Sequence, residues 1–149
     1  MKKTTLMLFL LISVMSVYAQ SSDEIAVKKH LNSYKQAIEK LDTIGIVNMF
    51  VKNSKVIEQS KVEGTISNYL QHHLGPELKE FKSFTFSDYK VEVKVVGNYA
   101  FTTETYFYTI VLAKDPKELK SKGVATAILI KTKDGWKIEK IHSSYKKLN

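Results

Sequence analysis

The segment 68–81, NYLQHHLGPELKEF, places two adjacent histidines ahead of a Gly-Pro pair and a carboxylate. Imidazole is a common metal ligand and an acid or base that titrates near neutral pH. At helical spacing, Leu70 and Leu74 mark an apolar stripe; His73 falls near its centre, and His72 falls about 100° away. The two rings diverge and cannot share a metal. We expect His72 at the surface and His73 on the buried face, as a core residue or a ligand-pocket residue.

Glu77 follows His73 by four residues, a spacing that lets an intact helix present both side chains on one face. The Gly-Pro pair between them predicts a helix end, because proline cannot donate the helical hydrogen bond. A metal site of His73, His142 and either Glu104 or Glu77 would require this helix to close the mouth of a cavity. The spacing matches no zinc-binding motif. We predict no metal and no cofactor.

Glu104 is a candidate general acid or base. Gly97-Asn98 is typical of a tight hairpin, which pairs Val91 with Glu104 and places the carboxylate on an apolar face. Burial there would raise its pKa, as proton transfer near neutral pH requires. The alternative is a Glu104 that pairs with a lysine or a tyrosine hydroxyl, or lies at the sheet edge. Tyr106 and Tyr108 share this face, where they donate hydrogen bonds to a ligand or simply pack.

His142 is the second candidate acid or base. A two-residue Asp134-Gly135 hairpin loop would pair Ala127 with His142. Two alanines on the same face leave room for a ligand, and Ser144 follows two residues after the histidine. The alternative is a histidine in a mixed polar core, bonded to Ser144 or a tyrosine. The predicted face carries Ala125, Ala127, Leu129, Trp136, Ile138 and His142.

The elements that should position these side chains begin with predicted helices at the start of the chain. Ser21 and Glu24 fit a capping box that begins a helix over 23–41. The later predicted elements are a short helix carrying Ile46, Val47 and Phe50, a strand over 54–59, and a helix over 65–74.

From Ser83 onward the sequence alternates with a period of two. The phase of the alternation switches at Ser87-Asp88, which indicates a β-bulge. Further strands are predicted over 99–112, 124–133 and 136–145. We therefore expect an α+β fold in which N-terminal helices pack on a curved antiparallel β-sheet, forming a cone with an internal pocket.

The first nineteen residues predict a cleaved signal peptide, with Lys2 and Lys3 before an apolar run and small residues ahead of the cleavage site. Residues 20–149 then form a single domain, periplasmic or secreted, without a membrane anchor after cleavage. The chain contains no cysteine, so its core must stabilise it without disulfides. All its basic residues are lysines. Because arginine supplies the bidentate contacts typical of nucleic-acid readers, we expect no nucleic-acid partner.

The C-terminal stretch GVATAILIKTKDGWKIEKIHSS resembles the SnoaL-like family of the nuclear transport factor two superfamily. Gly123 opens its first strand, Trp136 follows the hairpin, and His142 with Ser144 forms a terminal H-x-S. The resemblance implies the cone-shaped fold and a homodimer. It is compatible with ketosteroid isomerases, polyketide cyclases, dehydratases and assembly modules.

Three functions are compatible with these patterns. The first is binding of a small apolar or amphipathic molecule. The second is an isomerase, cyclase or dehydratase that uses Glu104 and His142 as acid and base. The third is a non-catalytic dimerisation or interaction domain whose cone is filled by side chains. The predicted pocket residues are His73, Glu104, Tyr106, Tyr108, Ala127, Trp136, Ile138, His142 and Ser144.

Overall fold

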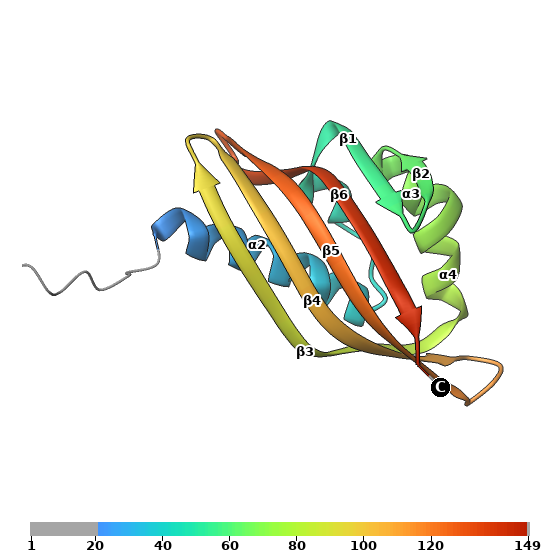
Figure 1. Cartoon of the computed structure of the whole chain (residues 1–149). Coiled ribbons are helices and arrows are strands. Elements are labelled where there is room, and N and C mark those ends of the chain that lie inside the picture. The colour runs from blue at the N-terminus through green and yellow to red at the C-terminus, as the bar shows by residue number, and fades with distance from the viewer. Residues whose placement is uncertain (1–20, 149) are drawn as a thin grey trace, which may run out of the picture.

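The computed structural model describes residues 21–148, so the predicted signal peptide over 1–19 lies outside the described residues. Figure 1 shows one long helix crossing a face of a twisted sheet, with the shorter helices beside β1 and β2 at one end. The α+β class is therefore confirmed. The elements in chain order are α2 (Ser22–Glu39), the short 3-10 helix η1 (Ile46–Met49), β1 (Phe50–Glu58), β2 (Lys61–Gly64), α3 (Ile66–Tyr69), the π-helical turn η2 (Leu70–Leu74), α4 (Gly75–Glu80), β3 (Phe81–Val96), β4 (Tyr99–Leu112), β5 (Glu118–Thr132) and β6 (Gly135–Lys147).

Helix α2 begins where the capping pattern predicts. The Ser21 side chain accepts a hydrogen bond from the Glu24 backbone N–H at 3.2 Å, which satisfies one of the free donors of the first turn. The buried residues of α2 are Val27, Leu31 and Ile38, which form one stripe that faces the sheet. The second predicted helix is only the turn η1, and Phe50 is the first residue of β1 instead.

The sheet has the strand order β2-β1-β6-β5-β4-β3. Strand β1 runs parallel to β6, with Val56 beside Ile141, whereas the other neighbouring pairs are antiparallel. The expectation of a purely antiparallel sheet is wrong at this pair. Alternation predicts a strand and its buried face, but it does not predict the direction of a partner far away in the chain.

The predicted β-bulge is confirmed. The β3–β4 register shifts between Ser87 and Lys90, and Asp88 has a φ of 50°. Before the bulge, even-numbered residues such as Phe86 face inward; after it, odd-numbered residues such as Tyr89 do. The bulge therefore keeps apolar side chains on the inner face on both sides of it, aromatic through Tyr89 and valine beyond.

The segment around the two histidines continues through Gly75-Pro76, so the predicted helix end there is wrong. Leu70–Leu74 forms a π-helical turn, in which the Gly75 N–H donates to the Leu70 carbonyl. A Cβ atom at Gly75 would lie 2.2 Å from that carbonyl oxygen, so the turn requires glycine. The wider turn accommodates Pro76 and lets α4 continue in the same direction.

The last hairpin differs from the predicted register, and this changes which residues face inward. Thr132 pairs with Gly135, so the two-residue loop is Lys133-Asp134 instead of Asp134-Gly135. The register then shifts by one more residue between Ile128 and Leu129. Ala127 therefore pairs with Ile141, and His142 pairs with Thr126 on the outer face. A bulge of one residue reverses the faces of everything beyond it.

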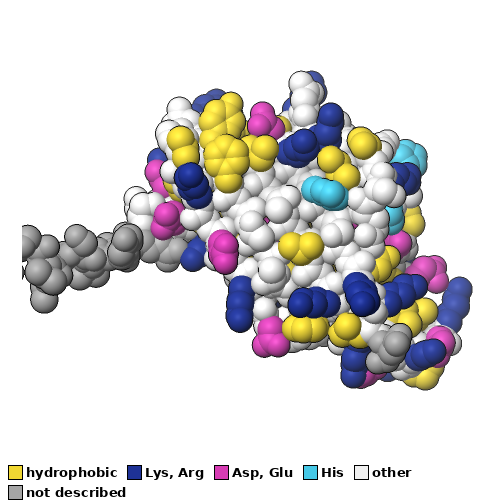
Figure 2. All heavy atoms as spheres, viewed as in Figure 1, with side chains coloured by type: hydrophobic (Ala, Val, Ile, Leu, Met, Phe, Trp, Pro, Cys, Tyr) yellow, Lys and Arg dark blue, Asp and Glu magenta, His cyan; other side chains and the backbone are white. Residues whose placement is uncertain are grey.

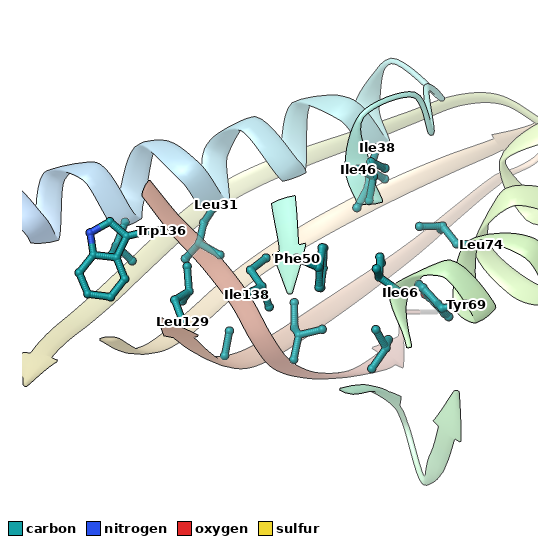
Figure 3. Packing of buried hydrophobic residues seen from close by; sticks show 14 of the residues in the cluster. Leu31, Ile38, Ile46, Phe50, Ile66, Tyr69, Leu74, Leu129, Trp136 and Ile138 are labelled. Atoms are coloured by element: carbon teal, nitrogen blue, oxygen red, sulfur yellow. The ribbon is translucent and has the colours of Figure 1, made fainter. Parts of the chain in front are cut away.

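The narrow end of the cone is filled by a packed core. Figure 3 shows Leu31 of α2 pointing toward Leu129 and Ile138, with Trp136 beside the N-terminal half of the helix. The Trp136 indole N–H donates to Asp23 at 3.3 Å, and Lys131 forms an ion pair with the same carboxylate at 2.7 Å. These contacts fix α2 on the sheet and leave the opposite end of the cone as the place for a cavity.

Candidate functional site

A cavity of about 660 Å³ lies at the wide end of the cone, partly open to solvent. Its walls come from the C-terminal half of α2, the segment α3–α4 and the wide ends of the sheet strands. The volume suits a drug-sized ligand. The third function considered from the sequence required a cone filled by side chains, and this volume contradicts that requirement.

One wall of the cavity is continuous aromatic surface from β3 and β4. Phe86 lies centrally, with ring centroids 4.9 Å from Phe84 and 5.1 Å from Tyr106. Tyr108 stacks on Phe84 at 5.1 Å, and Tyr89 stacks on Tyr106 at 6.1 Å. The wall is continuous because the bulge shifts the alternation of β3 by one residue. Phe86 before the bulge and Tyr89 after it therefore both face the cavity.

Glu104 lies at this wall, opposite Val91 as predicted, and is only 5% exposed. The Tyr89 hydroxyl donates a short hydrogen bond to its Oε2, while Oε1 has no hydrogen-bond partner among residues 21–148. Burial raises the pKa of Glu104 to about 7, although the hydrogen bond from Tyr89 acts in the opposite direction. The carboxyl group is therefore able to take or give a proton near neutral pH.

A second polar cluster surrounds His73, which faces the cavity as predicted, whereas His72 is exposed. The His73 Nδ1 lies 3.0 Å from Glu63, and its Nε2 lies 3.2 Å from Glu77 and 3.7 Å from Glu58. Burial alone would lower the pKa of His73, but the contact with Glu63 and the charges of Glu77 and Glu58 raise it above its usual range.

Tyr69 completes this cluster and donates a hydrogen bond to Glu58 at 2.6 Å. Glu58, Glu63 and Tyr69 were not predicted as site residues. Tyr69 was recognisable on the apolar stripe of its helix. The two glutamates come together with His73 only because the β1–β2 hairpin folds against η2.

The structure brings five of the predicted pocket residues to the cavity: His73, Glu104, Tyr106, Tyr108 and Ser144. The prediction is wrong for the other four. Ala127, Trp136 and Ile138 belong to the packed core at the narrow end. His142 is exposed on the outer face, where its Nε2 lies 2.8 Å from the Gln59 carbonyl oxygen.

The metal site considered from the sequence cannot form. His73 faces the cavity and His142 the opposite side of the sheet, so they cannot bind one ion. Within residues 21–148, no group of three or more His, Cys, Asp or Glu side chains has a geometry able to hold a metal ion. None of the helices over the same residues is long and apolar enough to span a membrane.

The fold and cavity define a cone-shaped α+β protein with an internal pocket. The family model of the SnoaL-like domain matches residues 27–146, so the chain belongs to this family. No curated protein sequence matches the chain.

Solved structures of the nuclear transport factor 2-like superfamily share the fold. A superfamily protein from Salmonella enterica has a TM-score of 0.70 and 22% identity, covering 83% of this chain and 89% of that one. A protein from Shewanella frigidimarina, provisionally named a ketosteroid isomerase, has a TM-score of 0.67 and 24% identity over 80% of this chain and 94% of that one. One from Streptomyces avermitilis, provisionally named a dehydratase, has a TM-score of 0.73 and 19% identity over 82% and 95%. At these identities the likeness extends to the fold alone.

Proposed function

We propose that the mature chain is an exported protein that binds a small amphipathic molecule in the cavity. The observation that carries this proposal is the aromatic wall of a 660 Å³ cavity with a buried carboxyl group at its surface. Aromatic rings bury the apolar body of a ligand, and one or a few polar groups orient it.

A matched pair of phenylalanine variants tests the binding proposal. Phe84 lies on the cavity wall, whereas Phe101 is exposed on the outer face of β4. Phe84→Ala should weaken binding of 1-naphthylmethanol, measured by calorimetry, by about tenfold, because it removes ring contact with the ligand. Phe101→Ala should leave the affinity unchanged. Equal affinities of all three proteins, or binding by none, would contradict the proposal.

Native mass spectrometry tests both the export and the occupancy of the pocket. The protein is purified from its own compartment without added ligand. A chain that begins at Gln20 would support cleavage of the signal peptide, and a mass excess would identify a bound molecule. A chain that retains residues 1–19 would contradict the export proposal.

A second candidate function is proton transfer on the bound molecule. It rests on the buried Glu104, whose pKa is raised to about 7 and whose Oε1 has no hydrogen-bond partner in the described part of the chain. His142 lies on the outer face and cannot be its catalytic partner; Tyr89, which donates to Glu104, and Tyr106, which stacks on Tyr89, are hydroxyl groups on the same cavity wall. Exchange of the carbon-bound α-hydrogens of 2-tetralone with D₂O, followed by NMR, tests this function.

The expected result is catalysed exchange by the wild type and by Glu92→Gln, a matched change on the exposed face of β3. Glu104→Gln should abolish the exchange while 2-tetralone still binds. Exchange at the wild-type rate in Glu104→Gln would remove Glu104 from the reaction.

A further inference from the structure

The two most deeply buried charged groups of the cavity are carboxyl groups. Glu63 and Glu104 are the two buried acidic residues in the described part of the chain. The Lys61 and Lys120 side chains at the cavity are 71% and 58% exposed. Lys35 is a more deeply placed lysine, 16% exposed, and Glu39 neutralises it through an ion pair at 2.7 Å. The charge buried in the cavity without a counter-charge is therefore acidic.

The two buried carboxylates differ in their partners. Glu63 lies 3.0 Å from the Lys61 ammonium and 3.0 Å from His73. Within residues 21–148, Glu104 accepts a side-chain hydrogen bond only from the neutral Tyr89 hydroxyl. No lysine or histidine of these residues forms an ion pair with it. A buried carboxyl group with a free oxygen and no cation is costly unless a ligand supplies the missing charge and donor.

The aromatic wall beside Glu104 already accepts an ammonium group of the protein itself. The Lys35 Nζ lies 5.6 Å from the ring centroids of both Phe86 and Tyr89. Glu39 holds this lysine through an ion pair at 2.7 Å, so Lys35 is not the partner of Glu104. The ring faces attract a cation through their quadrupoles, and the same surface continues over Tyr106.

The geometry points to a primary or secondary organic amine as the ligand class of this cavity, with its ammonium group at Glu104 Oε1 and its ring or hydrocarbon body along the aromatic wall. This inference rests on the proposed binding function and specifies its ligand. An anionic ligand would place a like charge beside Glu104. A quaternary ammonium would bring the charge without the N–H donor that the unpaired oxygen lacks.

Three naphthalene probes of nearly equal shape separate charge from apolar binding: 1-naphthylmethylamine, 1-naphthylmethanol and 1-naphthoic acid. Calorimetry is performed at about pH 8, where the amine and Glu104 are both largely charged. The wild type should bind the amine at least about tenfold more tightly than the alcohol, as for a hydrogen bond between charged groups, and the acid most weakly.

Variants test whether Glu104 is the origin of this preference. Glu104→Gln should reduce the ratio of amine to alcohol affinity to about one, because the amide cannot neutralise the ammonium. Glu92→Gln, the matched change on the outer face, should keep the wild-type ratio. Thermal unfolding of each variant verifies that it is folded.

Proton release provides a second measurement that needs only the wild type. At about pH 6, where Glu104 is largely protonated, amine binding should release close to one proton per ligand, detected as a dependence of the heat on the buffer. The titratable groups around Glu104 are Tyr34 and Lys35 of α2, Tyr89 of β3 and Tyr106 of β4, and Glu58 of β1 lies further along the cavity. Burial raises the pKa of each of these three tyrosines, so they remain neutral throughout.

The outcomes separate this inference from the binding proposal. If the alcohol or the acid binds as tightly as the amine, or if Glu104→Gln keeps the preference, the amine inference is overturned and the binding proposal stands. If amine binding releases no proton, the inference is likewise overturned. If none of the three probes binds at millimolar concentration, both proposals fail.

Discussion

At the scale of single residues, the most consequential feature is Glu104, a carboxyl group buried without a cation. Its pKa rises from 4.5 to about 7 because burial disfavours the charged form, and this difference is also a contribution to stability. The unfolded chain releases the Glu104 proton first as the pH rises. The folded state therefore loses stability between about pH 4.5 and pH 7 through this group.

We predict that Glu104→Gln becomes more stable relative to the wild type as the pH rises. At about 1.4 kcal/mol per pKa unit, ionising buried Glu104 costs roughly 3 kcal/mol, which glutamine avoids. Chemical denaturation at about pH 5 and about pH 8 measures the change. A difference in unfolding free energy that is constant with pH would contradict the burial of an uncompensated charge.

His73 should show a pH dependence in the same direction, because its pKa is also raised in the folded state. Its pKa is raised in the folded state by the surrounding glutamates, so its stabilising contribution is full below the unfolded pKa of about 6.5 and is lost as the pH rises through the folded pKa. His73→Gln should therefore cost up to about 1 kcal/mol at acidic pH and less at alkaline pH. The exposed neighbour provides the control, since His72→Gln should change the unfolding free energy little at either pH. An equal loss for His73→Gln at both pH values would show that packing, not charge, is responsible.

At the scale of elements, the π-helical turn in the cavity wall depends on one residue of the sequence, Gly75. Glycine in a helix interior normally destabilises it by about 1 kcal/mol relative to alanine. At Gly75 the sign should reverse, because the alanine Cβ would lie 2.2 Å from the Leu70 carbonyl oxygen. We predict that Gly75→Ala lowers the unfolding free energy by about 1–3 kcal/mol, measured by denaturant titration.

Gln71→Ala is the control for this substitution, since Gln71 is exposed in the same turn and should change stability by less than about 0.5 kcal/mol. The turn also carries His73 into the cavity. Gly75→Ala should therefore lower the pKa of His73 toward its usual value, which an NMR titration of the imidazole detects. A Gly75→Ala variant more stable than the wild type would mean that an ordinary α-helix can replace the turn.

At the scale of the whole molecule, the two faces of the sheet have different roles. The inner face holds the core and the cavity, and the outer face exposes apolar side chains, among them Tyr99, Phe101 and Val124. Figure 2 shows hydrophobic side chains gathered on the viewed face near the tip of the β3–β4 hairpin. The family resemblance implies a homodimer, and we propose that the second copy of the chain covers this face.

Phe101→Lys should convert a dimer into a monomer, because it places a desolvated charge in the proposed interface. Light scattering coupled to size-exclusion chromatography measures the mass. Val62→Lys on β2 changes a more exposed apolar residue away from this face and should leave the dimer intact. A wild-type monomer at micromolar concentration would contradict the proposed dimer.

The sequence by itself determined the features that depend on local pattern. The capping pair Ser21 and Glu24, the bulge at Ser87-Asp88 and the pairing of Val91 with Glu104 all follow from short-range chemistry and from a tight hairpin. Glu104, Tyr106 and Tyr108 could therefore be assigned to the inner face from the printed residues, because alternation along a strand fixes the face once the register is known.

Only the tertiary structure decided the features that depend on irregularity and on distant contacts. One extra residue in the last hairpin moved His142 to the outer face, and one π-helical turn kept His73 and Glu77 on a continuous helical segment. The Glu58–Glu63–His73 cluster and the parallel pairing of β1 with β6 join segments far apart in the chain. Such contacts are selected by the packing of the whole cone, since no local pattern distinguishes one distant partner from another.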